Sequence, residues 1–121
     1  MWFIAWLLMA VALFYSFGPI PPGTESFRYA DKVFHAATYM ATTLTFLLAA
    51  VWRPGRGTGA FPESAVWIVL GAIATGFGVE LLQGAFFGRH ADLTDGLADL
   101  IGVAVGSGLW LTLRAAFPAH R

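Results

Sequence analysis

Four long apolar runs separated by short polar segments constrain the fold of this chain more than any other feature of its sequence. The runs cover residues of about 1–17, 33–52, 65–87 and 97–117. A run of about 20 apolar residues matches the thickness of a bilayer, and a helix satisfies its own backbone hydrogen bonds in lipid. The sequence therefore predicts an all-α membrane protein, a four-helix transmembrane bundle with short loops, in a single domain over 1–121.

The composition agrees with lipid as the main solvent and excludes several functions. The chain is 58% hydrophobic and 12% charged, whereas a soluble domain carries about 25% charged residues. Its net charge is +0, without a basic run, so no nucleic-acid partner is predicted. The absence of cysteine excludes disulfides, thiol nucleophiles and thiolate metal sites. The first run lacks a basic n-region and is interpreted as a retained span, not a signal peptide.

The basic residues predict the orientation in the membrane. Four spans place both termini and the 53–63 loop on one side. That side carries Arg53, Arg56, Arg114 and Arg121, and the other side carries Arg28, Lys32 and Arg89. Cytoplasmic loops carry an excess of Lys and Arg. We therefore expect cytoplasmic termini, and an outer face formed by the loops 18–32 and 88–95.

Polar and ionisable residues gather at the ends of the spans that meet at this second face. The connectivity alone brings together the start of the second run, the end of the third and the start of the fourth. We predict a ligand-binding cluster there, consisting of Asp31, Lys32, His35, Tyr39, Glu80, Gln83, Arg89, Asp92, Asp95 and Asp99. Ionisable residues inside a span, such as Glu80 and Asp99, are candidates for a functional site. The alternative is a structural clasp that joins them to Arg89, Lys32 or His35.

Helical spacing predicts that these residues form stripes facing one another. The second run carries Asp31, His35, Thr38, Thr42 and Thr45, the third carries Gly76, Glu80, Gln83 and Gly84, and the fourth carries Asp95, Asp99, Gly102 and Gly106. The glycine pairs 84/88 and 102/106 have the spacing of close helix packing. Simpler readings also apply: Thr42 and Thr45 bond within their own helix, Asp95 is an N-cap, and Trp2, Trp6, Trp52 and Trp110 are interfacial aromatics.

Three kinds of chemistry fit this cluster. Glu80 and His35 are the candidate catalytic residues, as a general acid/base pair near neutral pH. Arg89 and Lys32 are suited to holding a phosphate or carboxylate group. Carboxylates near the hairpin could hold Mg²⁺ or Ca²⁺, but no spacing matches an established metal motif, so neither a metal nor a cofactor is predicted.

Two parts of the chain resemble the VanZ-like family. Residues 31–39, DKVFHAATY, are similar to its D-K-x-x-H-x-x-x-Y signature. Residues 80–106 are similar to its E-x-x-Q…R-x-x-D-x-x-D-x-x-x-N-x-x-G-x-x-x-G pattern, through Glu80, Gln83, Arg89, Asp92, Asp95, Gly102 and Gly106. The resemblance covers about residues 28–110. The chain departs from the pattern at Asp99, where the family usually has Asn.

The resemblance implies a bundle of about four helices in a bacterial cytoplasmic membrane. The family is named for an accessory protein of teicoplanin resistance, and no settled activity is attached to its fold. We therefore expect an envelope protein whose externally facing polar pocket binds a membrane lipid or a lipid-linked cell-wall intermediate. Two alternatives are an enzyme acting on such a lipid through Glu80 and His35, and a structural subunit of a larger membrane complex or homo-oligomer.

Overall fold

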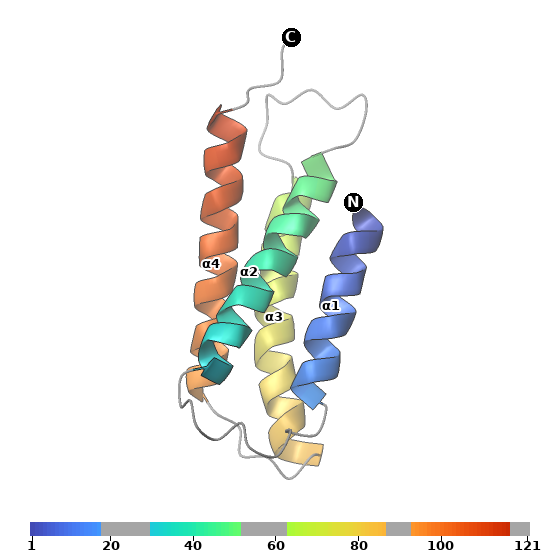
Figure 1. Ribbon diagram of the computed structural model, residues 1–121, viewed down its shortest axis with the longest axis vertical. Helices are drawn as coiled ribbons and strands as arrows, with labels where there is room; N and C mark the ends of the chain where they lie inside the picture. The colour runs from blue at the N-terminus through green and yellow to red at the C-terminus, as the bar shows by residue number, and fades with distance from the viewer. Residues whose placement is uncertain (18–29, 52–62, 87–92, 117–121) are drawn as a thin grey trace.

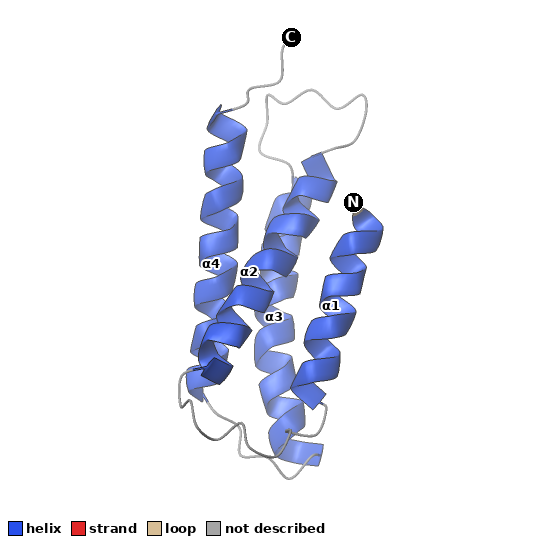
Figure 2. Ribbon diagram, viewed as in Figure 1, coloured by secondary structure: helices blue, strands red, loops and turns tan. Residues whose placement is uncertain are grey.

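Four helices packed side by side make up the described part of the chain, which comprises residues 1–17, 30–51, 63–86 and 93–116 of a computed structural model. The helices are α1 (Trp2–Phe17), α2 (Ala30–Val51), α3 (Glu63–Phe86) and α4 (Leu93–Ala116). Figure 1 shows α2 between α1 and α4, with α3 behind it. Figure 2 shows the described residues as helix throughout. The predicted fold class, a four-helix bundle without strands, is confirmed for these residues.

The helices extend beyond the predicted apolar runs at their polar ends. α2 begins at Ala30 and not at 33, and α4 begins at Leu93 and not at 97. Hydropathy identifies only the apolar part of each helix. The helical backbone begins earlier, in a polar first turn that carries Lys32 on α2 and Asp95 on α4. These added turns belong to the part of the chain that carries the candidate site.

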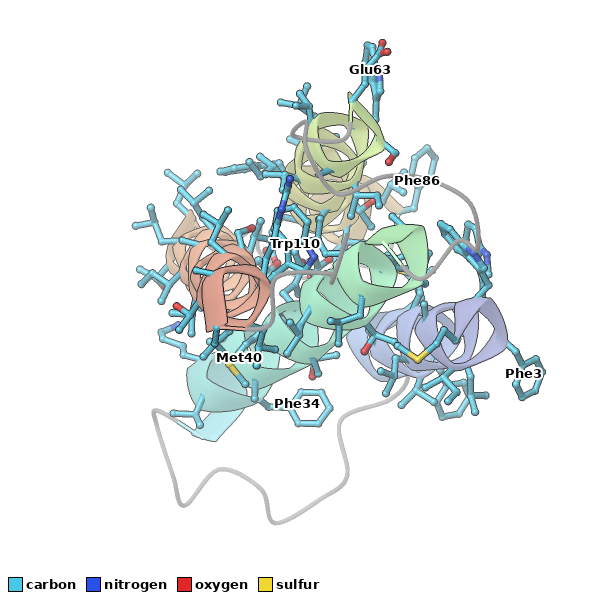
Figure 3. The ribbon with its side chains drawn as sticks, turned by 90° about the horizontal axis from the view of Figure 1, so that it is seen from above. Phe3, Phe34, Met40, Glu63, Phe86 and Trp110 are labelled. Carbon is cyan, nitrogen blue, oxygen red and sulfur yellow. The ribbon has the colours of Figure 1, made fainter. Side chains whose placement is uncertain are left out.

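The outer surface of the bundle is apolar, as a lipid solvent requires. Large hydrophobic side chains such as Phe3, Phe14 and Phe86 are exposed, and in Figure 3 Phe3 and Phe34 point away from the bundle. Three helical segments are long and apolar enough to cross a membrane, namely Lys32–Ala50, Glu63–Phe86 and Leu93–Ala116. α1 is more apolar than the other three helices but has only 16 residues, which corresponds to about 24 Å of helix.

The seam between α2 and α4 is the most extensive helix contact in the described part of the bundle. The two helices run in the same direction (Figure 1), and their backbones approach closely where α4 carries Gly102 and Gly106. A Cβ on Gly106 would lie 2.7 Å from the carbonyl oxygen of Met40. A Cβ on Gly102 would collide with the carbonyl group of Ala36. The predicted 102/106 packing motif is confirmed.

The predicted glycine pair 84/88 can be examined only at Gly84, which is not closely packed. Gly84 is exposed on α3, and residue 88 lies outside the described residues. The spacing of two glycines shows that they share a face of a helix, but it does not show which face another helix covers. The prediction of close packing at Gly84 is therefore wrong.

Trp110 was expected at the membrane interface and instead belongs to the core. Its side chain is 2% exposed and packs with Leu47 and Ala65, between the helices in the view of Figure 3. The guanidinium carbon of Arg114 lies 5.4 Å from the centroid of the Trp110 ring. Trp2 and Trp6 are exposed, as predicted for interfacial aromatics, but both also contact Phe46 edge-on. Trp52 lies outside the described residues.

Candidate functional site

Two polar pairs join the beginnings of α2 and α4. Lys32 Nζ donates a hydrogen bond to Asp95 Oδ1 at 3.0 Å. A hydrogen bond of 2.9 Å joins His35 Nδ1 to Asp99 Oδ1. The pairs lie on successive helical turns, since residues three or four apart share a face. Because both helices run in the same direction from this end, residues near their starts meet across the seam.

The two pairs differ in their access to the surroundings. The side chains of Lys32 and Asp95 are 30% and 14% exposed, whereas those of His35 and Asp99 are 10% and 3% exposed. The first pair therefore forms the outer layer of the site. The second pair lies one turn deeper, within the apolar part of the bundle.

Glu80 of α3 completes the deeper layer. Each of His35, Glu80 and Asp99 is buried, and one ligand atom of each lies within 4.8 Å of those of the other two. We call these three residues the buried triad. Three different helices supply them, so the triad exists only when α2, α3 and α4 are packed together.

Glycines beside the triad leave space for its carboxylates. A Cβ on Gly76 of α3 would lie 3.1 Å from Asp99 Cβ and 3.5 Å from Cε1 of Tyr39. A Cβ on Gly96 would lie 3.9 Å from Glu80 Cγ and 3.2 Å from the Phe77 ring. Gly76 was placed on the polar face of the third helix by its spacing from Glu80. Gly96 was missed, although it lies three residues before Asp99 and therefore on the same face.

Most of the predicted site residues that can be described converge as expected. Lys32, His35, Glu80, Asp95 and Asp99 form the two layers of the site, and Tyr39 and Gln83 are buried one turn from His35 and Glu80 respectively. The backbone of Asp31 belongs to α2, but its side chain is not among those described. Arg89 and Asp92 lie outside the described residues, so their predicted roles stay predictions.

Some of the simpler readings are confirmed and others are wrong. Thr45 bonds to the carbonyl oxygen of Ala41 at 2.7 Å, as expected. Thr42 does not bond within its helix in this way, because its buried hydroxyl oxygen has no hydrogen-bond partner in the described structure. Asp95 is not an N-cap: it is the third residue of α4 and bonds to Lys32. Thr38 belongs to the predicted stripe, yet its hydroxyl bonds to the carbonyl oxygen of Phe34.

The electrostatics of the triad set what it can do. A charge facing lipid near the membrane centre costs about 2.5–3.5 kcal/mol or more, so ionised carboxylates or a protonated imidazole inside the bundle need hydrogen bonds or opposite charge to stabilise them. A carboxylate and an imidazole in contact can share or exchange a proton. The same donor atoms are ligands for divalent metals. The arrangement is therefore chemically able to clasp helices, to move a proton or to hold a cation.

Fold and site together define a helical membrane protein with one polar end and a buried triad beneath it. A family profile, described as VanZ/LLP1, matches residues 1–114. The chain belongs to this VanZ/LLP1 family, which confirms the resemblance found in the sequence. A search of curated proteins and a search of solved structures found no match to the chain.

Proposed function

We propose that this protein is an accessory protein of the bacterial envelope that binds the anionic head group of a membrane lipid or of a lipid-linked cell-wall intermediate. The observation that carries the proposal is the Lys32–Asp95 pair, a partly exposed cation held 3.0 Å from a carboxylate at the polar end. In the orientation that the basic residues predict, this end faces the outside of the cytoplasmic membrane.

The position of Lys32 suits an anion that arrives from the membrane surface. It is the third residue of α2, where the unpaired N–H groups and the dipole of the helix favour negative charge. Its ammonium group has three donors, so a phosphate oxygen can bind while Asp95 keeps the side chain in place. The stem of a lysine can lie along apolar surface while its ammonium group reaches the interface.

Removing the Lys32 charge should abolish a preference for phosphate head groups. The Lys32→Gln variant, in detergent or nanodiscs, should bind a lipid phosphomonoester about tenfold more weakly than the wild type. A hydrogen bond to a charged group contributes about 1.5–3 kcal/mol, and the lower end of this range applies because Lys32 is shared between Asp95 and the phosphate. Native mass spectrometry with defined lipids measures the effect. Arg114→Gln is the matched control, since it removes one positive charge near the other end of α4. Equal losses in the two variants would indicate nonspecific attraction and would contradict the proposal.

Family membership supports a link with resistance to glycopeptides of the teicoplanin type. Expression of the chain in a susceptible bacterium should raise the teicoplanin concentration that inhibits growth by at least about twofold, the resolution of a doubling-dilution assay. Lys32→Gln should remove this gain at unchanged membrane abundance, because it removes the ammonium group on which head-group binding depends. A folded and abundant Lys32→Gln protein that still confers the full gain would exclude a role for the outer layer in resistance.

A structural subunit is the second candidate, and the His35–Asp99 bond between α2 and α4 favours it. In that case the triad is a clasp, and the partner is a larger membrane complex or a second copy of the chain. The enzyme alternative requires a substrate to reach Glu80 and His35, which are 5% and 9% exposed. Head-group binding requires only the outer layer and is therefore preferred.

A further inference from the structure

We propose that the buried triad of His35, Glu80 and Asp99 is a binding site for one first-row divalent transition-metal ion. One donor atom from each residue lies within 4.8 Å of the other two. The three residues come from α2, α3 and α4, so an ion bound among them would tie three helices together. The site is distinct from the outer Lys32–Asp95 layer and does not depend on lipid binding there.

The donor atoms are close to the separations that a metal ion imposes. Imidazole nitrogens and carboxylate oxygens lie about 2.0–2.2 Å from Zn²⁺, so two donors on one tetrahedral ion are separated by about 3.4 Å. His35 Nδ1 and Asp99 Oδ1 are 2.9 Å apart, which suits two adjacent ligands. The three donor atoms all lie within 4.8 Å of one another, so the widest pair must close by about 1 Å when an ion binds.

The charge of the triad also favours a divalent cation. With both carboxylates ionised and His35 neutral, the three side chains carry a formal charge of −2. Protonation of His35 reduces this to −1. A divalent ion brings it to zero while His35 stays neutral, which is the form of histidine that binds metals. A bound cation offsets the negative charge of these three side chains inside an apolar span, where charge is costly.

The mixture of ligands selects the class of metal. Imidazole suits Zn²⁺ and carboxylates suit Mn²⁺, a transition-metal ion, whereas Mg²⁺ and Ca²⁺ prefer sites built from oxygen alone. One histidine with two carboxylates therefore points to Zn²⁺ or Mn²⁺ over Mg²⁺ or Ca²⁺. Three protein ligands leave at least one coordination position for water or another small ligand.

The residues around the buried triad suit the positioning of Asp99 as a metal ligand. Gly76 provides the space in which the Asp99 carboxylate lies, since a Cβ there would be 3.2 Å from Asp99 Oδ2. Tyr39 borders the same point, 3.5 Å from that Cβ position, and is itself buried. Its hydroxyl group can serve as an outer partner of the kind that orients metal-bound carboxylates. Sequence motifs did not predict this site because its ligands are far apart along the chain.

Metal content and metal-dependent stability test the site directly. Purified protein is stripped with EDTA, exchanged into buffer with Zn²⁺, Mn²⁺, Mg²⁺ or Ca²⁺, desalted and assayed by inductively coupled plasma mass spectrometry and thermal unfolding. We expect about one Zn²⁺ or Mn²⁺ per chain and a raised Tm. Glu80→Gln should bind at least about tenfold more weakly, since even changes beside a metal ligand cost about 10–100-fold. Asp95→Asn removes a carboxylate from the outer layer and should keep full metal binding.

Each possible result either supports the metal site or contradicts it. Stoichiometric Zn²⁺ or Mn²⁺ that is lost in Glu80→Gln and kept in Asp95→Asn supports the site. Equal binding by both variants, binding lost only in Asp95→Asn, or no metal-dependent change in Tm overturns it. A response to Mg²⁺ or Ca²⁺ equal to that with Zn²⁺ overturns the assignment of metal class. Circular dichroism of each variant excludes loss of the helical fold as the cause.

Discussion

Gly102→Ala should destabilise the bundle by about 3 kcal/mol and lower its Tm by about 10 °C. A Cβ at this position collides with the carbonyl group of Ala36, and neither backbone can rotate away as a side chain would. α4 must therefore move away from α2, the helix with which it shares its most extensive contact. Gly106→Ala should act in the same direction, because its Cβ would lie 2.7 Å from the Met40 carbonyl oxygen.

Gly108 provides the matched control on the same helix. A Cβ there would have nothing within 4 Å, and replacing glycine by alanine in a helix is favourable by up to about 1 kcal/mol. Gly108→Ala should therefore be neutral or stabilising. Thermal unfolding in detergent, followed by circular dichroism, measures all three variants. A Gly102→Ala protein as stable as Gly108→Ala would show that α2 and α4 do not pack as described.

The sequence predicted the architecture well because hydropathy and helix length are local properties. Four apolar runs gave four helices, and connectivity placed their polar ends together. The exact helix ends and the burial of individual faces were predicted less well. Trp110 illustrates the reason, since tryptophan suits both a membrane interface and a core. Only the rotation of α4 about its own axis, which packing against α2 and α3 decides, places this ring inside.

The candidate site was predicted as a set of residues but not as a set of partners. The sequence left Asp99 able to pair with Arg89, Lys32 or His35, because spacing along one helix does not fix its rotation or stagger relative to another. The close approach at Gly102 and Gly106 sets that stagger, and with it Asp99 lies beside His35 and Asp95 lies beside Lys32. This helix packing brings the three residues of the triad together, and no sequence motif indicates that they are partners.

The departure from the family pattern at position 99 also becomes interpretable. Asp99 Oδ1 forms a hydrogen bond with His35 Nδ1. The side-chain carbonyl oxygen of an asparagine can accept a hydrogen bond from an imidazole N–H in the same place. An asparagine in this position can therefore keep the hydrogen bond that joins α2 to α4. It supplies no negative charge, so the aspartate adds to this chain the capacity for an ion pair or a metal ligand.

Asp99→Leu should destabilise the protein by about 3 kcal/mol, the lower end of the range for removing one partner of a buried pair. Asp99→Asn should cost about 1 kcal/mol, since it keeps the acceptor and loses the charge. Asp95→Leu is the control, because its pair with Lys32 is partly exposed and such pairs contribute about 0–1 kcal/mol. Chemical or thermal unfolding in EDTA measures folding alone, free of any effect of bound metal.

A double-mutant cycle then distinguishes an ion pair from an ordinary bond between helices. Hydrogen bonds between membrane helices average about 0.6 kcal/mol and reach about 1.7 kcal/mol. A coupling energy of about 2 kcal/mol or more between His35→Leu and Asp99→Leu, obtained as the deviation from additivity, identifies a charged and mutually dependent pair. A coupling energy near 0.6 kcal/mol would instead identify the contact as an ordinary hydrogen bond between helices. In that case the stability of the bundle would owe little to charge attraction between His35 and Asp99.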